Sequence, residues 1–202
     1  DCRAIIYKFL RIRRGFDMKV KIKNALLNPI SMFILGLISG VVVKEIDIHF
    51  YAQLFGFSLS EIFSEIGIWV VIGVVISLYS KNTKYAMLNT FAYCIGMIIT
   101  YYITAELTDS VYGWAYIKMW AAFACLSPIM AYLVTLTKNP GVLAFVIKIG
   151  IFAGYIVINL ILGAFIKIYD ILFFAILIYL LFFRKHQKTD GKKDQNDMDL
   201  MP

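Results

Sequence analysis

Between positions 85 and 105 the chain reads YAMLNTFAYCIGMIITYYITA, a run without a single charged side chain. As an α-helix, about 20 such residues cross the roughly 30 Å hydrocarbon core of a bilayer. The run does not alternate apolar and polar residues as a half-buried strand does, and an open sheet would leave unpaired backbone groups in lipid. This stretch therefore predicts a transmembrane helix and an all-α fold.

Five other runs have the same character, and the composition agrees with them. Of 202 residues, 61% are apolar and only 16% are charged, and the mean hydropathy is +0.77. These values exclude a soluble enzyme domain and a disordered chain, and three scattered cysteines exclude a disulfide scaffold. We predict a polytopic membrane protein with six transmembrane helices over residues 27–43, 62–79, 85–105, 114–137, 142–165 and 168–183.

The basic residues predict the orientation of these spans. Sixteen of the twenty Lys and Arg residues fall before the first span, in the 81–84 and 138–141 turns, or after the last span. Only Lys44 and Lys167 fall on the opposite side, so both termini are predicted to be cytoplasmic. The formal charge of +7 then reflects contact with anionic lipid headgroups, and no nucleic-acid partner is expected.

This orientation divides the chain into three parts. Residues 1–26 form a basic cytoplasmic segment, residues 27–183 the transmembrane domain, and residues 184–202 a disordered polar tail. Because Asp1 is not a translation start and Met18 is a plausible one, residues 1–17 are either a basic interfacial helix or non-native sequence. The loop at 44–60, rich in aromatic residues, is expected to lie at the outer interface or over the bundle.

No catalytic or metal-binding signature is present in the sequence. It lacks HExxH, GxSxG, phosphate-loop and dinucleotide motifs, and its only histidines, His49 and His186, lie on opposite sides of the membrane. We therefore expect neither an enzyme nor a bound cofactor or metal.

Aromatic and polar residues gather at the outer ends of the predicted spans. They form either an interfacial aromatic belt or an outward-facing pocket in which rings stack on a flat or cationic solute. Lys118 and Lys148 either snorkel to water or line a cavity, and Glu65 could pair with Lys118 if their helices touch. The candidate ligand-binding residues are Glu65, Trp69, Tyr101, Tyr102, Glu106, Trp114, Lys118 and Trp120.

Two GxxxG motifs predict close approach of helix backbones. They consist of Gly36 with Gly40 and of Gly150 with Gly154. Each serves either packing within the chain or docking to another membrane subunit, including a second copy.

Short motifs between residues 30 and 140 resemble an uncharacterised domain-of-unknown-function family of small multi-pass bacterial membrane proteins. The stretches are EIGIW at 65–69, YSK at 79–81, LN at 88–89, GM at 96–97, YY at 101–102 and SPI at 127–129. This resemblance implies a bacterial inner-membrane location and no particular activity. In architecture the chain is also similar to the substrate-binding subunits of energy-coupling-factor transporters, which implies an outward-facing pocket covered by the first outer loop.

Two functions remain open from the sequence. The first is a component that binds or transports a small solute through an outward-facing aromatic pocket. The second is a non-transport membrane partner or assembly protein that acts through its helix faces.

Overall fold

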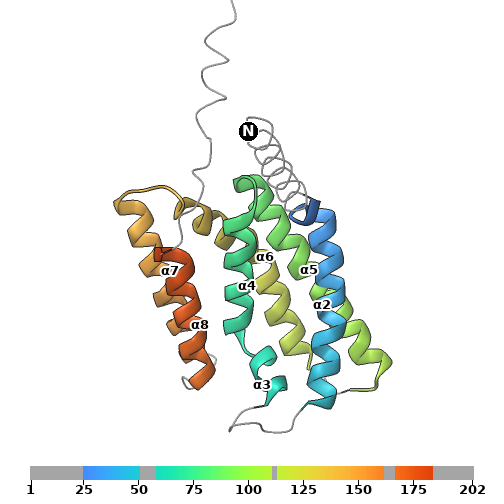
Figure 1. Cartoon of the computed structure of the whole chain (residues 1–202). Helices are drawn as coiled ribbons and strands as arrows, with labels where there is room; N and C mark the ends of the chain where they lie inside the picture. Colours follow the sequence, from blue (N-terminus) through green and yellow to red (C-terminus); the bar gives the residue numbers. More distant parts are fainter. Residues whose placement is uncertain (1–24, 51–57, 111–112, 162–166, 184–202) are drawn as a thin grey trace, which may run out of the picture.

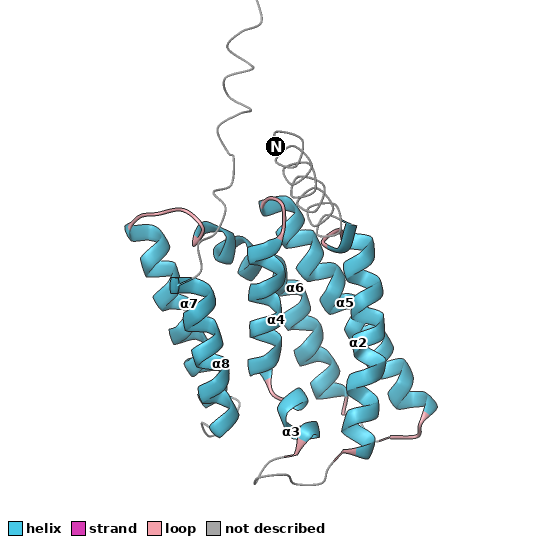
Figure 2. Cartoon of the chain, in the orientation of Figure 1, coloured by secondary structure: helices cyan, strands magenta, loops and turns pink. Residues whose placement is uncertain are grey.

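The computed structural model describes residues 25–50, 58–110, 113–161 and 167–183. Within these ranges every regular element is helical and no strand occurs, which confirms the all-α class (Figure 2). The predictions for the N-terminal segment up to residue 24, for residues 51–57 of the aromatic loop and for the tail from residue 184 lie outside the described residues.

Four of the described helices are long and apolar enough to cross a membrane: α2 (Pro29–His49), α5 (Thr83–Leu107), α6 (Trp114–Leu136) and α7 (Val142–Ile161). Shorter apolar helices are α4 (Ile66–Tyr79) and α8 (Ile168–Ile178), the latter continued by a π-helical turn, η1 (Tyr179–Phe183). A six-residue helix, α3 (Leu59–Ser64), precedes α4.

Polar side chains define where several helices begin. Asn28 caps α2 by accepting a hydrogen bond from the Ser31 backbone N–H at 2.9 Å, and Pro29 follows at the first helical position. Ser58 caps α3 in the same way, accepting from the Glu61 N–H at 3.1 Å. That contact is the one expected from the spacing of serine and glutamate in the sequence.

The first predicted span was too short, because α2 continues through residues 44–49. These residues are polar but pair at helical spacing: Lys44 bonds Asp47, and His49 lies 3.3 Å from Glu45. Side chains three and four positions apart face each other on a helix, so the polar segment extends α2 rather than opening a loop.

The second predicted span is interrupted, since Glu65 has an extended backbone that separates α3 from α4. The indole N–H of Trp69 donates a hydrogen bond of 3.0 Å to the Phe63 carbonyl, which satisfies an acceptor near the break. As a result α3 lies between the beginning of α4 and the end of α2 (Figure 1). We call this end of the bundle, where α2 and α5 finish and α4 and α6 begin, the α3 end.

Helices α2 and α5 pack closely, backbone against backbone. The backbone at Gly36 and Gly40 approaches the α5 backbone around Tyr93 and Met97, and Gly96 of α5 faces Phe33 in return. Helix α6 lies beside α5, and α4 contacts both of them. A second core, formed by Val74, Leu78, Val134, Ile151, Tyr155, Leu177, Leu180 and Leu181, joins α4 and α6 to α7 and α8.

The outer surface of the bundle is apolar. Ile30, Val142 and Ile168 are 74%, 81% and 74% exposed, and many other large aliphatic side chains point outward. A soluble monomer rarely exposes contiguous apolar surface of this kind, whereas a bundle surrounded by lipid does.

Candidate functional site

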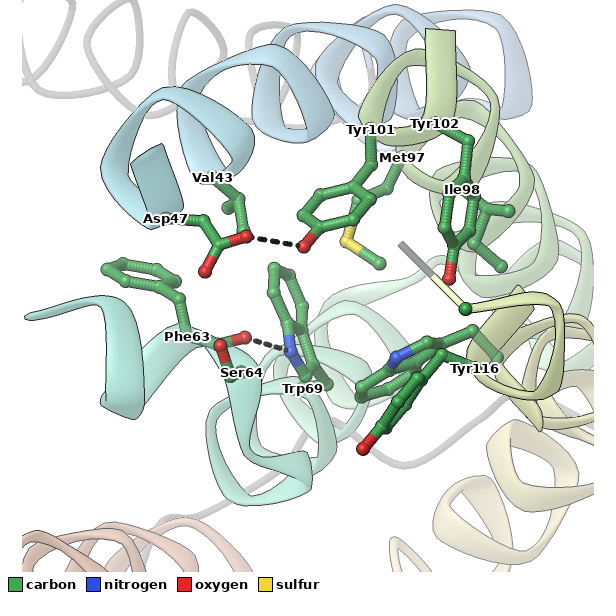
Figure 3. A pocket seen from close by; sticks show the side chains of 12 residues that line it. Val43, Asp47, Phe63, Ser64, Trp69, Met97, Ile98, Tyr101, Tyr102 and Tyr116 are labelled. Carbon is green, nitrogen blue, oxygen red and sulfur yellow. Dashed lines mark hydrogen bonds between the residues drawn. The ribbon is translucent and has the colours of Figure 1, made fainter. Parts of the chain in front are cut away.

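A pocket of about 380 Å³ lies at the α3 end, between elements that are far apart in the sequence (Figure 3). Six of its twelve lining residues are aromatic. The lining residues are Val43, Asp47, Phe63, Ser64, Trp69, Met97, Ile98, Tyr101, Tyr102, Gly113, Tyr116 and Trp120.

Four of the six aromatic rings of the pocket are held by contacts with one another or with the backbone. Tyr101 and Tyr102 meet edge to face with ring centroids 5.2 Å apart, and Phe63 packs on Trp69 at 6.2 Å. The hydrogen bond from Trp69 to the Phe63 carbonyl fixes the indole further. Rings fixed in this way can receive a flat or cationic group without first being ordered.

Asp47 is the acidic residue of the pocket wall, and its carboxylate is paired with the ammonium of Lys44. Its carboxylate accepts hydrogen bonds from Lys44 Nζ at 3.0 Å, Ser60 Oγ at 2.9 Å and the Tyr101 hydroxyl at 2.9 Å. A carboxylate offers about four lone-pair sites, so one acceptor site remains, and the side chain is still 28% exposed. The Lys44 side chain is only 3% exposed and lies with Nζ 5.0 Å from the centre of the Tyr101 ring.

Four of the eight predicted ligand-binding residues line this pocket: Trp69, Tyr101, Tyr102 and Trp120. Trp114 and Lys118 lie on the opposite face of α6 from the pocket residues two positions further along, because two positions on a helix turn by about 200°. Trp114 is 72% exposed, and Lys118 and Glu106 are exposed as well. None of these three residues is among the residues that line the pocket.

Glu65 does not pair with Lys118, contrary to what the sequence suggested. Its Oε1 accepts a hydrogen bond of 2.8 Å from Lys167, which also pairs with Glu61. The hydrogen bond from Lys167 lowers the pKa of the Glu61 carboxyl, against a smaller opposing effect of burial. This cluster ties α3 and the start of α4 to the start of α8.

Asp170 joins the same region and was not singled out from the sequence. Its carboxylate accepts from the Tyr155 hydroxyl at 2.6 Å and from the Lys167 backbone N–H at 2.9 Å, so it caps α8 and ties it to α7. The carboxylate is therefore engaged in holding two helices together.

Asp47 was also missed, although a signal for it exists. Residues 36, 40, 44 and 47 follow one another at steps of four, four and three, which places them on one helix face. Extending the GxxxG face of α2 by two turns thus leads to Lys44 and Asp47. A loop assignment for residues 44–60 hid this continuity.

The two GxxxG motifs lie in different surroundings. A Cβ atom added at Gly36 or Gly40 would overlap backbone carbonyl oxygens of α5. A Cβ atom added at Gly150 or Gly154 would meet no atom within 4 Å. Nearby on α7, Lys148 is half-buried and its Nζ lies 5.0 Å from the centre of the Phe182 ring.

In the described part of the chain no group of three or more His, Cys, Asp or Glu side chains is placed to hold a metal ion. No family model, curated protein or solved structure matches the chain.

Proposed function

We propose that this chain is a component for small-solute binding or transport in a bacterial plasma membrane, with six spans and both termini in the cytoplasm. The solute enters the aromatic pocket from the outer side, at the α3 end. The distribution of charge supports this orientation, because Lys81, Lys84 and Lys138 lie at the other end of the bundle. All acidic residues of the described ranges lie at the α3 end: Glu45, Asp47, Glu61, Glu65, Glu106, Asp109 and Asp170.

The two shorter apolar helices complete the six spans. Helix α4 has 14 residues and a length of about 21 Å, and α8 with η1 covers residues 168–183, or about 24 Å. Each is somewhat shorter than the hydrocarbon core, a mismatch that a bilayer accommodates by thinning locally.

The observation that carries the solute-binding proposal is the pocket itself. Six aromatic rings surround a volume suited to a small molecule, and Asp47 keeps one carboxylate site available. Aromatic faces attract cations and stack on flat rings. A flat or cationic solute fits this lining best.

Calorimetric titration of the protein in lipid nanodiscs with benzyltrimethylammonium tests this function. This probe combines a flat ring with a cation and lacks a long chain. We expect saturable binding that weakens at least tenfold in Trp120→Ala and stays unchanged in Trp114→Ala, whose indole lies on the opposite face of α6. Absence of saturable heat, or equal weakening in both variants, contradicts the proposal.

A second candidate is a partner or assembly protein that uses its helix faces. The open surroundings of Gly150 and Gly154 favour it, because small residues without neighbours allow another helix to approach α7. If a second copy docks there, Gly154→Cys forms a disulfide between copies in native membranes. Ile156→Cys, on the opposite side of α7, forms none; equal cross-linking at both positions, or at neither, argues against this face.

A further inference from the structure

An apolar groove adjoins the aromatic pocket and opens on the outer face of α6, where Leu126, Ile129 and Met130 are 52%, 56% and 45% exposed. It has a volume of about 240 Å³ and lies between α4, α5, α6 and α7. Four residues, Trp69, Met97, Ile98 and Trp120, line both cavities. The groove therefore lies directly beside the aromatic pocket.

The lining of the groove offers almost no hydrogen-bonding group. It consists mainly of aliphatic side chains and methionines, with four aromatic residues, Cys94 and the hydroxyl residues Ser77, Thr90 and Ser127; the aromatic residues are Trp69, Tyr93, Trp120 and Phe123. Ser77 and Ser127 both line it, yet each hydroxyl donates within its own helix, to Gly73 O at 2.7 Å and to Ala124 O at 2.8 Å. The groove thus suits a chain without polar atoms.

The length of the groove sets the length of that chain. Measured from the two tryptophans that it shares with the pocket, its lining runs eight residues, or about 12 Å, along α4 to Ser77 and fourteen residues, or about 21 Å, along α6 to Val134. A fully extended chain advances about 1.2 Å per bond, as the extended polypeptide shows. About 10 to 17 bonds therefore fill the distance.

The charge around the opening of the aromatic pocket determines the charge of the ligand's head group. Seven acidic residues of the described ranges lie at the α3 end, against the ammonium groups of Lys44, Lys118 and Lys167. This excess of negative charge concentrates cations at the mouth and repels anions. Asp47 and the six rings then receive a cationic head at close range.

We infer that the solute is a cationic amphiphile, with its head in the aromatic pocket and a single alkyl chain of about 10 to 17 carbons in the groove. This inference rests on the proposed solute-binding function and specifies its substrate class. The adjacency of the two cavities carries it, together with the complementary charge around the opening of the pocket.

Three probes with the same flat ring separate the contributions of head and chain. Benzyltrimethylammonium presents the head alone, benzyldimethyldodecylammonium adds the chain, and dodecylbenzenesulfonate keeps ring and chain but reverses the charge. Each is titrated below its micellar concentration against the full chain in nanodiscs, with empty nanodiscs as the reference.

A matched pair of glycine variants distinguishes binding in the groove from partition into lipid. A Cβ at Gly73 would lie 3.8 Å from Thr90 Cγ2, in ordinary contact, so Gly73→Leu places its side chain in the groove without meeting backbone. Gly154→Leu adds the same side chain to α7 where nothing lies within 4 Å. Lipid partition is the same for both variants, so a difference between them reports the groove.

We expect the dodecyl cation to bind at least tenfold more tightly than benzyltrimethylammonium, and the sulfonate at least tenfold more weakly than the dodecyl cation. Gly73→Leu abolishes the advantage of the chain but retains benzyltrimethylammonium binding, which also shows that the pocket is folded. Gly154→Leu changes neither affinity. Ser127→Leu, which fills the groove from α6, repeats the result should Gly73→Leu fail to fold.

Several outcomes overturn the inference. They are equal affinity for both cations, equal affinity for the sulfonate and the dodecyl cation, or an advantage of the chain that survives filling of the groove. In those cases benzyltrimethylammonium still binds and the proposed function stands. If benzyltrimethylammonium itself does not bind, the proposed function fails and the inference fails with it.

Discussion

Replacement of Gly36 by alanine should separate α2 from α5. The added Cβ would overlap the Tyr93 carbonyl oxygen and would lie 3.0 Å from the carbonyl carbon and 3.1 Å from the Met97 nitrogen. These are backbone atoms of a helix and cannot turn aside, so the two helices must move apart. The movement would also lengthen the 2.7 Å hydrogen bond from Thr100 Oγ1 to the Leu37 carbonyl.

The size of the effect follows from two opposing contributions. Overpacking costs about 1–3 kcal/mol, and a weakened hydrogen bond about 1 kcal/mol more. Alanine in place of glycine favours the helix by up to about 1 kcal/mol. The net loss is about 1–3 kcal/mol, which lowers the melting temperature of a chain of this size by about 2–12 °C.

Thermal unfolding in a mild detergent, followed by circular dichroism, measures this loss. Gly150→Ala is the matched control, because it makes the same chemical change on α7, where a Cβ meets nothing within 4 Å. It should leave the melting temperature unchanged or raise it. The reasoning is refuted if Gly36→Ala is as stable as Gly150→Ala.

Three further predictions concern the α3 end and the orientation. Lys167→Met should lower the melting temperature at pH 7. The bond to Lys167 lowers the pKa of Glu61, so the stabilisation that it gives is lost when Glu61 is protonated. The difference in melting temperature from wild type should therefore shrink as the pH falls below about 4. Asp47→Asn should destabilise the protein by about 2 kcal/mol, since it leaves a buried lysine ammonium without its carboxylate. In a cysteine-free background, Asp109→Cys should react with an impermeant thiol reagent added outside intact cells, and Thr83→Cys only in inverted vesicles.

Each of these predictions has a control. Lys118→Met removes an exposed lysine and should change stability little at any pH. If the melting temperatures of Lys167→Met and wild type still differ below about pH 4, the role given to Lys167 is contradicted. Glu45→Gln removes a carboxylate from an exposed pair and should cost well under 1 kcal/mol. Labelling with the opposite sidedness overturns the orientation.

The helical class and the approximate position of each apolar segment followed from the sequence, because twenty apolar residues leave few structural choices. The segment expected at 85–105 is contained in α5, and the segment at 114–137 matches α6 within one residue. The end of α2 could not be predicted from the sequence, because hydropathy marks where a segment becomes polar and not where its helix ends. The break at Glu65 also could not be predicted, because it lies inside one apolar run and the bond that satisfies the backbone there comes from Trp69.

The aromatic residues of the pocket could be predicted from the sequence, but its acidic residue could not. Trp69, Tyr101, Tyr102 and Trp120 were identified by residue type and by their position near the ends of predicted spans. Which acid joins them depends on which helices are neighbours, and the sequence alone does not show that α2 lies against α5 or that α8 begins beside α3. Glu65 therefore received the wrong partner, and Asp47 was overlooked.

The unequal helix lengths have a consequence for the surrounding bilayer. Helix α5 has 25 residues and is about 37 Å long, whereas α8 with η1, on the far side of α4, reaches only about 24 Å. If α8 spans the bilayer as proposed, lipids beside α5 keep their full thickness, while those beside α8 shorten or tilt. The protein would thus tilt or deform the membrane toward one flank, and lipids with short acyl chains would collect there in preference to long ones.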